Sequence, residues 1–334
     1  MKRTTPLPDT LPEADPQKME EARDRDKHLT KPAGALGRLE GLVTWLAGWQ
    51  RRYPPRLQRV EAVVFAGNHG IVEQGVSAYP AEVTAQMLKN FEAGGAAVSQ
   101  LCRSFDVRLR TYPLSIDQPA LDFTKGPSLG KDQFEEAFAC GMNAAEEGID
   151  LLCLGEMGIG NTAAAAALAH ALYGGRAVAW TGPGTGVAGE RLEKKRRVVA
   201  AGARLHLSKT TDALDLLRRL GGFELAAIAG AVIGARLRRI PVLLDGFVCS
   251  AAAASLEVAR SGALDHCQMA HVSAEPGHRL LLRRLGKRPL LDLDMRLGEA
   301  SGAALAVALV RAAVACHMGM ATFDDAGVAN RDGG

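Results

Sequence analysis

Two glutamates stand in glycine-rich turns, where a carboxyl group could act on a bound ligand. Glu299 lies in Arg296-Leu-Gly-Glu-Ala-Ser-Gly302, directly before an alanine-rich segment. Its glycine and apolar neighbours predict a desolvated carboxyl with a raised pKa, which a general acid or base requires. The alternative is an ordinary carboxylate at a helix start, favoured there by the helix dipole. The residues by themselves support both interpretations equally.

Glu156 belongs to the turn Gly155-Glu-Met-Gly-Ile-Gly-Asn-Thr162, which opens a predicted helix. Its glycines, Gly155 and Gly158 among them, let a ligand approach the backbone, and the first N–H groups of the helix attract an anion. Asn161 or Thr162 could instead only cap the helix. Capping does not explain Glu156, so we favour a functional turn.

A third turn, Thr181-Gly-Pro-Gly-Thr-Gly186, continues to Gly189 and contains a literal G-x-G-x-x-G. A dinucleotide site also needs a second strand that ends in an acidic residue about 20 residues later. A basic helical segment follows here instead. We therefore predict a phosphate cradle at Gly182 and Gly184, with Lys194 or Lys195 as the cation. The alternative is that Lys194–Arg197 form a solvated helix face.

Metal and nucleophile signatures are weak in this chain. A possible set of metal ligands is Cys267, His271 and His278, with Asp265 or His266 as the fourth. The spacing of these residues matches no compact zinc motif. The sequence contains neither G-x-x-x-x-G-K-[ST] nor G-x-S-x-G, which disfavours nucleoside triphosphatases and serine hydrolases. We expect no metal and no cofactor.

Apolar runs alternate with helical segments, which predicts an α/β fold with a Rossmann-like, mostly parallel sheet and helices on both faces. The predicted strands are Ala62–Phe65, Val107–Tyr112, Leu151–Leu154, Ala177–Trp180 and Pro241–Leu244, with Gln268–Val272 as a further candidate. The predicted helices are Leu39–Trp49, Val83–Phe91, Gln133–Glu147, Thr162–Leu172, Glu190–Leu207, Glu224–Arg238, Val248–Arg260 and Ser301–Met320.

Five glycine-containing turns follow apolar runs. They are Phe65–Gly70, Leu154–Asn161, Trp180–Gly186, Leu244–Phe247 and His271–His278. If the runs are parallel strands, all five turns lie at one edge of the sheet, where open α/β folds bind ligands. The sequence thus predicts the place of a site before its chemistry is known.

Composition points to a small-molecule partner. Among 334 residues 47% are hydrophobic, and 40 basic residues nearly balance 37 acidic ones. This balance requires neither a nucleic acid nor an anionic membrane. The start has no apolar core of a signal peptide, and no uncharged apolar stretch is long enough to span a bilayer. We expect a cytoplasmic protein whose six cysteines are reduced thiols.

The turns taken together resemble the nicotinate-nucleotide:5,6-dimethylbenzimidazole phosphoribosyltransferase family. The blocks that carry the resemblance run in order from Lys31 to near the C-terminus. They are Lys31–Glu40, Ala66–Gly70, Gly75–Pro80, Gly155–Thr162, Leu244–Phe247, Ser273–His278 and Arg296–Glu299.

The resemblance implies transfer of phosphoribose from nicotinate mononucleotide to 5,6-dimethylbenzimidazole, for the lower ligand of cobalamin. It also implies a homodimer and a small helical domain built from residues 1–55 and 303–334, beside a catalytic domain at 56–302. By the family pattern, Glu299 and Glu156 are catalytic. Lys195 and Ser273 join the glycine turns in binding the mononucleotide, and a flat apolar slot takes the base. The residues expected in that slot are Tyr79, Pro80, Gln86, Met87 and Leu297.

Two rival functions remain at this point. A dinucleotide-dependent oxidoreductase would use Gly184, Gly186 and Gly189, and NAD would then stabilise the protein. A binding protein without turnover would keep the pocket but release no product.

Overall fold

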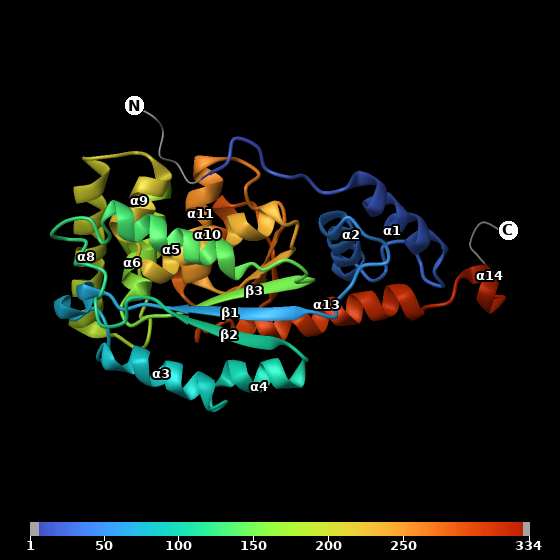
Figure 1. Ribbon diagram of the computed structural model, residues 1–334, viewed down its shortest axis with the longest axis horizontal. Coiled ribbons are helices and arrows are strands. Elements are labelled where there is room, and N and C mark those ends of the chain that lie inside the picture. The colour runs from blue at the N-terminus through green and yellow to red at the C-terminus, as the bar shows by residue number, and fades with distance from the viewer. Residues whose placement is uncertain (1–6, 330–334) are drawn as a thin grey trace.

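The computed structural model describes residues 7–329 and has a six-stranded, wholly parallel sheet at its centre (Figure 1). Its strands are β1 (Val60–Ala66), β2 (Arg108–Pro113), β3 (Leu151–Met157), β4 (Val242–Leu244), β5 (Cys267–His271) and β6 (Pro289–Leu291). They lie in the order β2-β1-β3-β4-β5-β6. The order reverses between β1 and β3, and such a reversal marks the ligand edge of an open α/β sheet. The predicted fold class is confirmed.

Helices cover both faces of the sheet. One face carries α3 (Glu82–Glu92), α4 (Ala97–Ser104) and α13 (Ser301–Gly319), together with the N-terminal helices α1 (Pro16–His28) and α2 (Arg38–Gln50). The other face carries α5 (Lys131–Ala144), α6 (Asn161–Tyr173), α7 (Ala177–Trp180), α8 (Gly189–Leu207), α9 (Ala213–Leu220), α10 (Phe223–Leu237), α11 (Phe247–Ala259) and α12 (Pro276–Arg284). The short helices η1 (Gly70–Gln74) and α14 (Phe323–Ala326) complete the described chain.

The two faces form two separate cores because strand side chains alternate. Val63 and Phe65 of β1 pack into the core with α5, α6 and α10, whereas Ala62 and Val64 pack into the core with α2, α4 and α13. Strands buried on both faces are mostly apolar, which is why simple apolar runs predicted β1, β3 and β4.

One predicted strand is wrong. Ala177–Trp180 forms the short helix α7, in which Trp180 is buried and its indole N–H donates to the Gly174 carbonyl at 2.8 Å. Four apolar residues cannot be assigned to strand or buried helix by periodicity. The turn at Trp180–Gly186 therefore follows a helix. Strand β6 and helices α4, α9 and α12 were not predicted. β6 is an edge strand of only three half-buried residues, too short for a periodicity to show.

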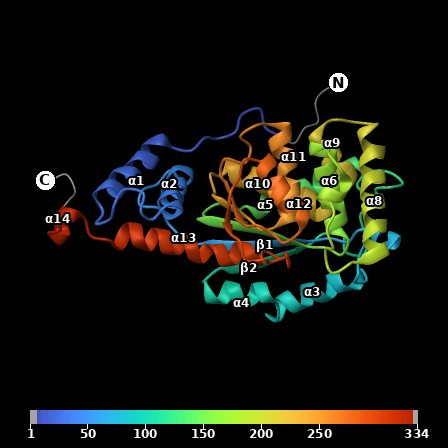
Figure 2. The ribbon, with the colours of Figure 1, turned by 180° about the vertical axis from the view of Figure 1, so that it is seen from behind.

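The chain ends meet beside the sheet. Helix α13 runs beneath the sheet and continues outward to α1 and α2, as the two opposite views show (Figures 1 and 2). Arg25 of α1 donates to the carbonyls of His317 and Met318, at 2.9 and 3.2 Å. These contacts agree with a small helical unit made from both ends of the chain, but the division at residues 55 and 303 stays a prediction. Residues 1–6 and 330–334 lie outside the described range. The first of these segments belongs to the N-terminal stretch in which no signal peptide is expected.

Within residues 7–329, α13 is the one helix long and apolar enough to cross a membrane, with a mean hydropathy of 1.6. It packs on α2, α4 and the sheet. Arg311 in its middle donates to the backbone carbonyls of Leu57, Phe105 and Asp106. A core helix of a folded domain has these properties too.

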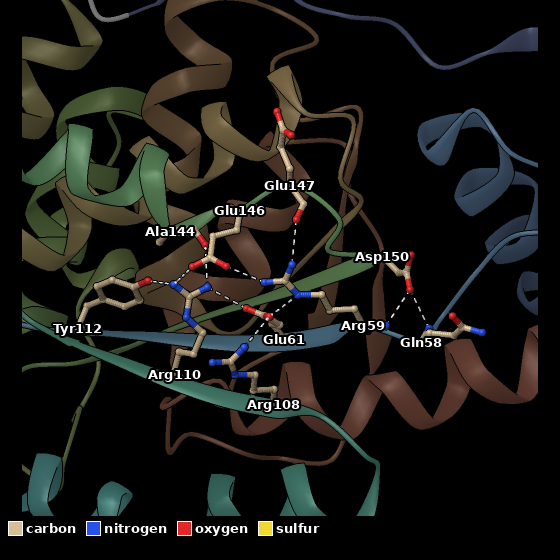
Figure 3. A network of polar contacts seen from close by, with 10 residues as sticks. All are labelled: Gln58, Arg59, Glu61, Arg108, Arg110, Tyr112, Ala144, Glu146, Glu147 and Asp150. Atoms are coloured by element: carbon tan, nitrogen blue, oxygen red, sulfur yellow. Dashed lines mark hydrogen bonds and ion pairs between the residues drawn. The ribbon is translucent and has the colours of Figure 1, made fainter.

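A buried carboxylate joins β1 and β2 at the amino-terminal edge of the sheet (Figure 3). Glu61 is completely buried and accepts hydrogen bonds from Arg59 Nε at 2.8 Å and Arg110 Nη1 at 2.9 Å. Both guanidinium groups also reach Glu146, just beyond α5, at 2.6 and 2.5 Å. Because a buried carboxylate is costly without partners, these arginines are what allow Glu61 in an otherwise apolar strand.

Helices α5 and α10 pack so closely that glycine is required between them. A Cβ added to Gly230 would overlap the Phe138 carbonyl, and one added to Gly141 would overlap the Ala227 carbonyl. We expect Gly230→Ala to lower the free energy of unfolding by about 2 kcal/mol, because the helices must separate. Gly41→Ala on α2, where a Cβ meets no atom within 4 Å, is the matched control. It should be neutral or stabilising by up to about 1 kcal/mol. Urea denaturation measures both, and equal effects would contradict this packing.

Candidate active site

A cavity of about 370 Å³ opens at the carboxyl ends of β3, β4 and β5. Four of the five predicted turns supply its wall, together with α3 and the segment before α13. The turn Phe65–Gly70 lies behind the wall, because a Cβ on Gly158 would meet the Gly67 carbonyl oxygen at 2.6 Å. The predicted edge of the sheet therefore does carry the site, with that one turn as support.

A larger cavity of about 740 Å³ lies at the opposite edge, between the N-terminal arm, α2 and the ends of α10 and α11. Of the residues considered for chemistry, only Asp265 of the weak metal set lines it. Two of its three arginines stabilise the fold: Arg236 donates to the Pro12 carbonyl, and Arg260 donates to the carbonyls of Pro8 and Asp9. The smaller cavity is thus the better candidate for chemistry.

Glu299 reaches the cavity from the turn before α13. Its side chain is buried, and its backbone N–H donates to the Glu156 carbonyl at 3.1 Å. Burial, followed by the charge of Asp245, raises the pKa of Glu299 to about 7. The sequence left two interpretations of Glu299 open, and this burial favours the desolvated carboxyl over an ordinary helix-start carboxylate.

Glu156 stands at the end of β3, opposite Phe65 of β1. Burial raises its pKa to about 8, and the charges of Asp245 and Glu224 act in the same direction. The side-chain amide of Asn161 donates to Glu156 Oε2 and opposes that shift. Two carboxyl groups with raised pKa values therefore line one cavity, a common property of sites that move protons.

The start of α6 faces the cavity without a side-chain cap. Gly160 is the N-cap residue, with φ of 97°. Asn161 donates to Glu156, and the Thr162 hydroxyl accepts from Lys195 Nζ at 3.0 Å, so neither side chain caps the helix. The capping interpretation is wrong. The N–H groups of Asn161 and Ala163 donate to the carbonyls of Gly158 and Gly160, at 3.2 and 3.0 Å, so the attraction of an anion to this helix start comes mainly from the helix dipole.

Lys195 lies behind the cavity wall rather than on it. Only 1% of the residue is exposed, and Nζ also donates to the Gly182 carbonyl at 3.1 Å. Burial lowers the pKa of Lys195 to about 8, against the opposing charge of Glu275. Glu275 itself accepts from the Gly184 N–H at 2.7 Å. Lys194 and Arg197 are exposed, as the solvated-face alternative predicts for part of this run.

Most residues predicted for the site do meet in the cavity. Those that line it are Tyr79, Met87, Glu156, Gly158, Asn161, Thr162, Gly184, Ser273, Leu297 and Glu299. Those that do not line it are Gly155, Gly182, Lys195, Pro80 and Gln86. Gly182 and Lys195 support the wall from behind, and Gly155 packs against the backbone of Ala300. Pro80 and Gln86 are exposed to solvent.

Other lining residues were not assigned to a ligand site from the sequence, among them Val83, Phe247, Glu275 and Arg296. His271, suggested only for a metal set, also lines the cavity. For α3 a signal was available: Val83 and Met87 are four residues apart and so share one helix face. Gln86 falls off that face. Arg296 belongs to the Arg296–Glu299 block of the resemblance, but no role was predicted for it. Its Nη1 donates to the Gly184 carbonyl at 2.9 Å and so joins two parts of the cavity wall.

The histidines and cysteines of the suggested metal set do not converge. His278 Nδ1 accepts from the Ser273 N–H at 2.8 Å, and its Nε2 contacts the Ser250 hydroxyl at 3.0 Å. Across residues 7–329 no group of three or more His, Cys, Asp or Glu side chains is placed to hold a metal ion. All six cysteines are free thiols. The G-x-G-x-x-G run follows helix α7, so the strand that a dinucleotide fingerprint needs is missing.

Comparison with known proteins tests the resemblance. A family described as phosphoribosyltransferase matches residues 11–328. A nicotinate-nucleotide–dimethylbenzimidazole phosphoribosyltransferase of Cereibacter sphaeroides is 56% identical over 321 residues, covering 96% of this chain and 95% of that protein. One of Rhizobium rhizogenes is 53% identical with the same coverage.

Solved structures agree. The crystal structure of the same-named enzyme from Thermus thermophilus has a TM-score of 0.88 and 40% identity, covering 95% of this chain and 99% of that chain. A structure of CobT from the same organism has a TM-score of 0.88 and 42% identity, with 94% and 100% covered. The chain therefore belongs to the nicotinate-nucleotide–dimethylbenzimidazole phosphoribosyltransferase family.

Proposed function

We propose that this protein transfers phosphoribose from nicotinate mononucleotide to 5,6-dimethylbenzimidazole, giving α-ribazole 5′-phosphate and nicotinate for cobalamin assembly. The observation that carries the proposal is the pair of buried carboxyls, Glu156 and Glu299, in one cavity of a chain with this family membership. We further propose that it acts as a homodimer, which the family resemblance implies.

Glu299 is the general base in this proposal. The pyridinium of nicotinate mononucleotide leaves with the C1′–N electron pair as a neutral ring nitrogen, so it needs no general acid. The unprotonated nitrogen of benzimidazole forms the new bond to C1′, and the proton on the other nitrogen passes to Glu299. A pKa of about 7 suits a base that works near neutral pH. Attack opposite the departing ring inverts C1′ and converts a β-linked nucleotide into an α-linked one.

Glu156 stabilises the positive charge that develops at C1′. Its pKa of about 8 means that the carboxyl is largely protonated at pH 7 in the empty site. The substrate brings a pyridinium cation, and a nearby cation favours the ionised carboxylate. Substrate binding therefore ionises the group that the transition state needs.

The 5′-phosphate rests against the start of α6 and the Gly182–Gly184 turn. Support comes from the uncapped helix N-terminus and from Lys195, which contacts Thr162 and Gly182 directly behind the wall. Ser273 lines the same cavity. The acceptor base lies among Tyr79, Val83, Met87 and Leu297, where an apolar aromatic ring gains contact area.

The activity is tested by incubating the protein with nicotinate mononucleotide and dimethylbenzimidazole in the presence of a chelator, which removes free metal ions. The products are then separated by chromatography. We expect α-ribazole 5′-phosphate and nicotinate in equal amounts. Binding of both substrates without product would instead support a protein that only binds them. Thermal stabilisation by NAD, but not by nicotinate mononucleotide, would favour the oxidoreductase.

Glu299→Gln should lower kcat by about 10²- to 10⁴-fold, the usual contribution of a general base, while both KM values change little. In the wild type, kcat should rise as pH increases through about 7, because the base must lose its proton first. Steady-state assays from pH 5.5 to 9 measure both effects. Glu136→Gln on the exposed side of α5 is the control. Unchanged turnover in Glu299→Gln would remove this residue as the base.

Lys195→Ala should raise KM for nicotinate mononucleotide about tenfold or more, because the turn proposed to bind the phosphate loses the charged hydrogen bonds from Lys195 to the Thr162 hydroxyl and the Gly182 carbonyl. A hydrogen bond from a charged group contributes about 1.5–3 kcal/mol. The KM for dimethylbenzimidazole should change far less. Lys194→Ala, on the exposed face of the same helix, is the matched control and should behave as wild type. Equal weakening of both substrates by Lys195→Ala would place the lysine away from the phosphate.

A further inference from the structure

The turn that presents Glu299 has an unfavourable backbone. Gly298, Glu299 and Ala300 have φ values of 85°, 62° and 62°, three left-handed residues in succession. A residue with a side chain in this region costs about 1–2 kcal/mol, so the surrounding structure must hold the turn in place. Ser301 contributes, since its N–H and hydroxyl both donate to the Gly298 carbonyl, at 3.0 and 2.7 Å.

Asp245 holds the same segment from the side of the sheet. It follows β4, is completely buried, and accepts the Ala303 N–H through Oδ1 at 2.9 Å. Ala303 lies in the first turn of α13, directly after the strained residues. A carboxylate at a helix start is bound by free N–H groups and favoured by the helix dipole.

We propose that Asp245 is a positioning residue: it anchors the start of α13, so that the left-handed turn presents Glu299, and its negative charge acts on both glutamates. The inference rests on the proposed transfer reaction for its meaning, but Asp245 itself touches no substrate. Its carboxyl is not part of the cavity wall.

The groups around Asp245 determine its charge. His271 of β5 places Nε2 at 3.5 Å, and the backbone N–H groups of Ala300 and Gly302 also favour the ionised form. Burial acts in the opposite direction and raises the pKa of Asp245. His271 is held there by close packing, because a Cβ on Gly302 would overlap its ring.

The remaining titratable neighbours are carboxyls and thiols. Cys153 of β3 and Cys249 of α11 are buried thiols whose pKa values burial raises well above the usual range, so both stay neutral. Burial is the largest cause of the raised pKa of Glu156 and of Glu299, and the charge of Asp245 is the second largest for both. Glu224, on α10, adds to the effect on Glu156. One anchoring carboxylate thus influences both groups proposed to act on the substrate.

Asp245→Asn separates charge from anchoring, because its amide oxygen can still accept the Ala303 N–H. We expect the acid limb of the kcat–pH profile to move down by about one pH unit, as expected for loss of a neighbouring charge. A weaker base should lower the plateau about three- to tenfold, with KM values nearly unchanged. Asp245→Ala also loses the anchor and should lower kcat about 10²-fold.

A direct measurement needs no turnover. In protein labelled with ¹³C at the glutamate side-chain carboxyl, with signals assigned through Glu299→Gln and Glu156→Gln, the Glu299 signal should titrate near pH 7 in the wild type. It should titrate lower in Asp245→Asn. Asp265→Asn, at the far edge of the sheet, is the matched control and should not move it.

The outcomes are distinct. A Glu299 titration that is unchanged in Asp245→Asn would overturn the inference, even if the wild type forms α-ribazole 5′-phosphate. Failure of the wild type to form that product would overturn the proposed function, while the NMR titration would still decide the influence of Asp245. If Asp245→Asn does not fold, the same titration is carried out in His271→Gln, which removes the histidine that faces Asp245. A Glu299 signal that does not move in that variant would also overturn the inference.

Discussion

Gly155 lets the backbone of Ala300 lie directly on β3, and the positions of both glutamates depend on that contact. A Cβ on Gly155 would overlap the backbone N–H group of Ala300. With that side chain absent, the Glu299 N–H reaches the Glu156 carbonyl, and the two acidic residues are tied together through the backbone. Two residues far apart in the sequence are thereby joined at adjacent points of one wall.

The site concentrates acidic groups where water is scarce. Glu156, Glu299 and Asp245 have raised pKa values, each with burial as the largest cause. Such a cluster is unfavourable in the empty protein, because charged carboxylates lose hydration and repel one another. A cationic pyridinium substrate relieves both costs, and this matches the proposed reaction better than an anionic or neutral donor would. In the proposed reaction the phosphate binds elsewhere in the cavity, at the start of α6 and the turn supported by Lys195.

Close packing and a buried ion-pair network hold the rest of the fold in place. Helices α5 and α10 meet through glycines at backbone distance, and the Glu61 network joins β1, β2 and the end of α5 at the edge away from the cavity. Beside the cavity, the turn Gly298–Ala300 holds three left-handed residues in succession. A well-packed core can hold such a turn, because few neighbouring groups are free to move aside.

The sequence by itself was sufficient for the parallel α/β class, the ligand edge of the sheet and the family, whereas the burial of Glu299 needed the structure. These depend on local signals: apolar runs, glycine turns and short blocks whose order is preserved along the chain. Only the tertiary structure decided that Ala177–Trp180 is helical, that Val83 rather than Gln86 faces the cavity, and that Lys195 lies behind Thr162. It also revealed Asp245 beneath the Glu299 turn. Such outcomes depend on which distant segments pack together, and a local pattern carries no information about the distance between two side chains that only the folded chain brings into contact.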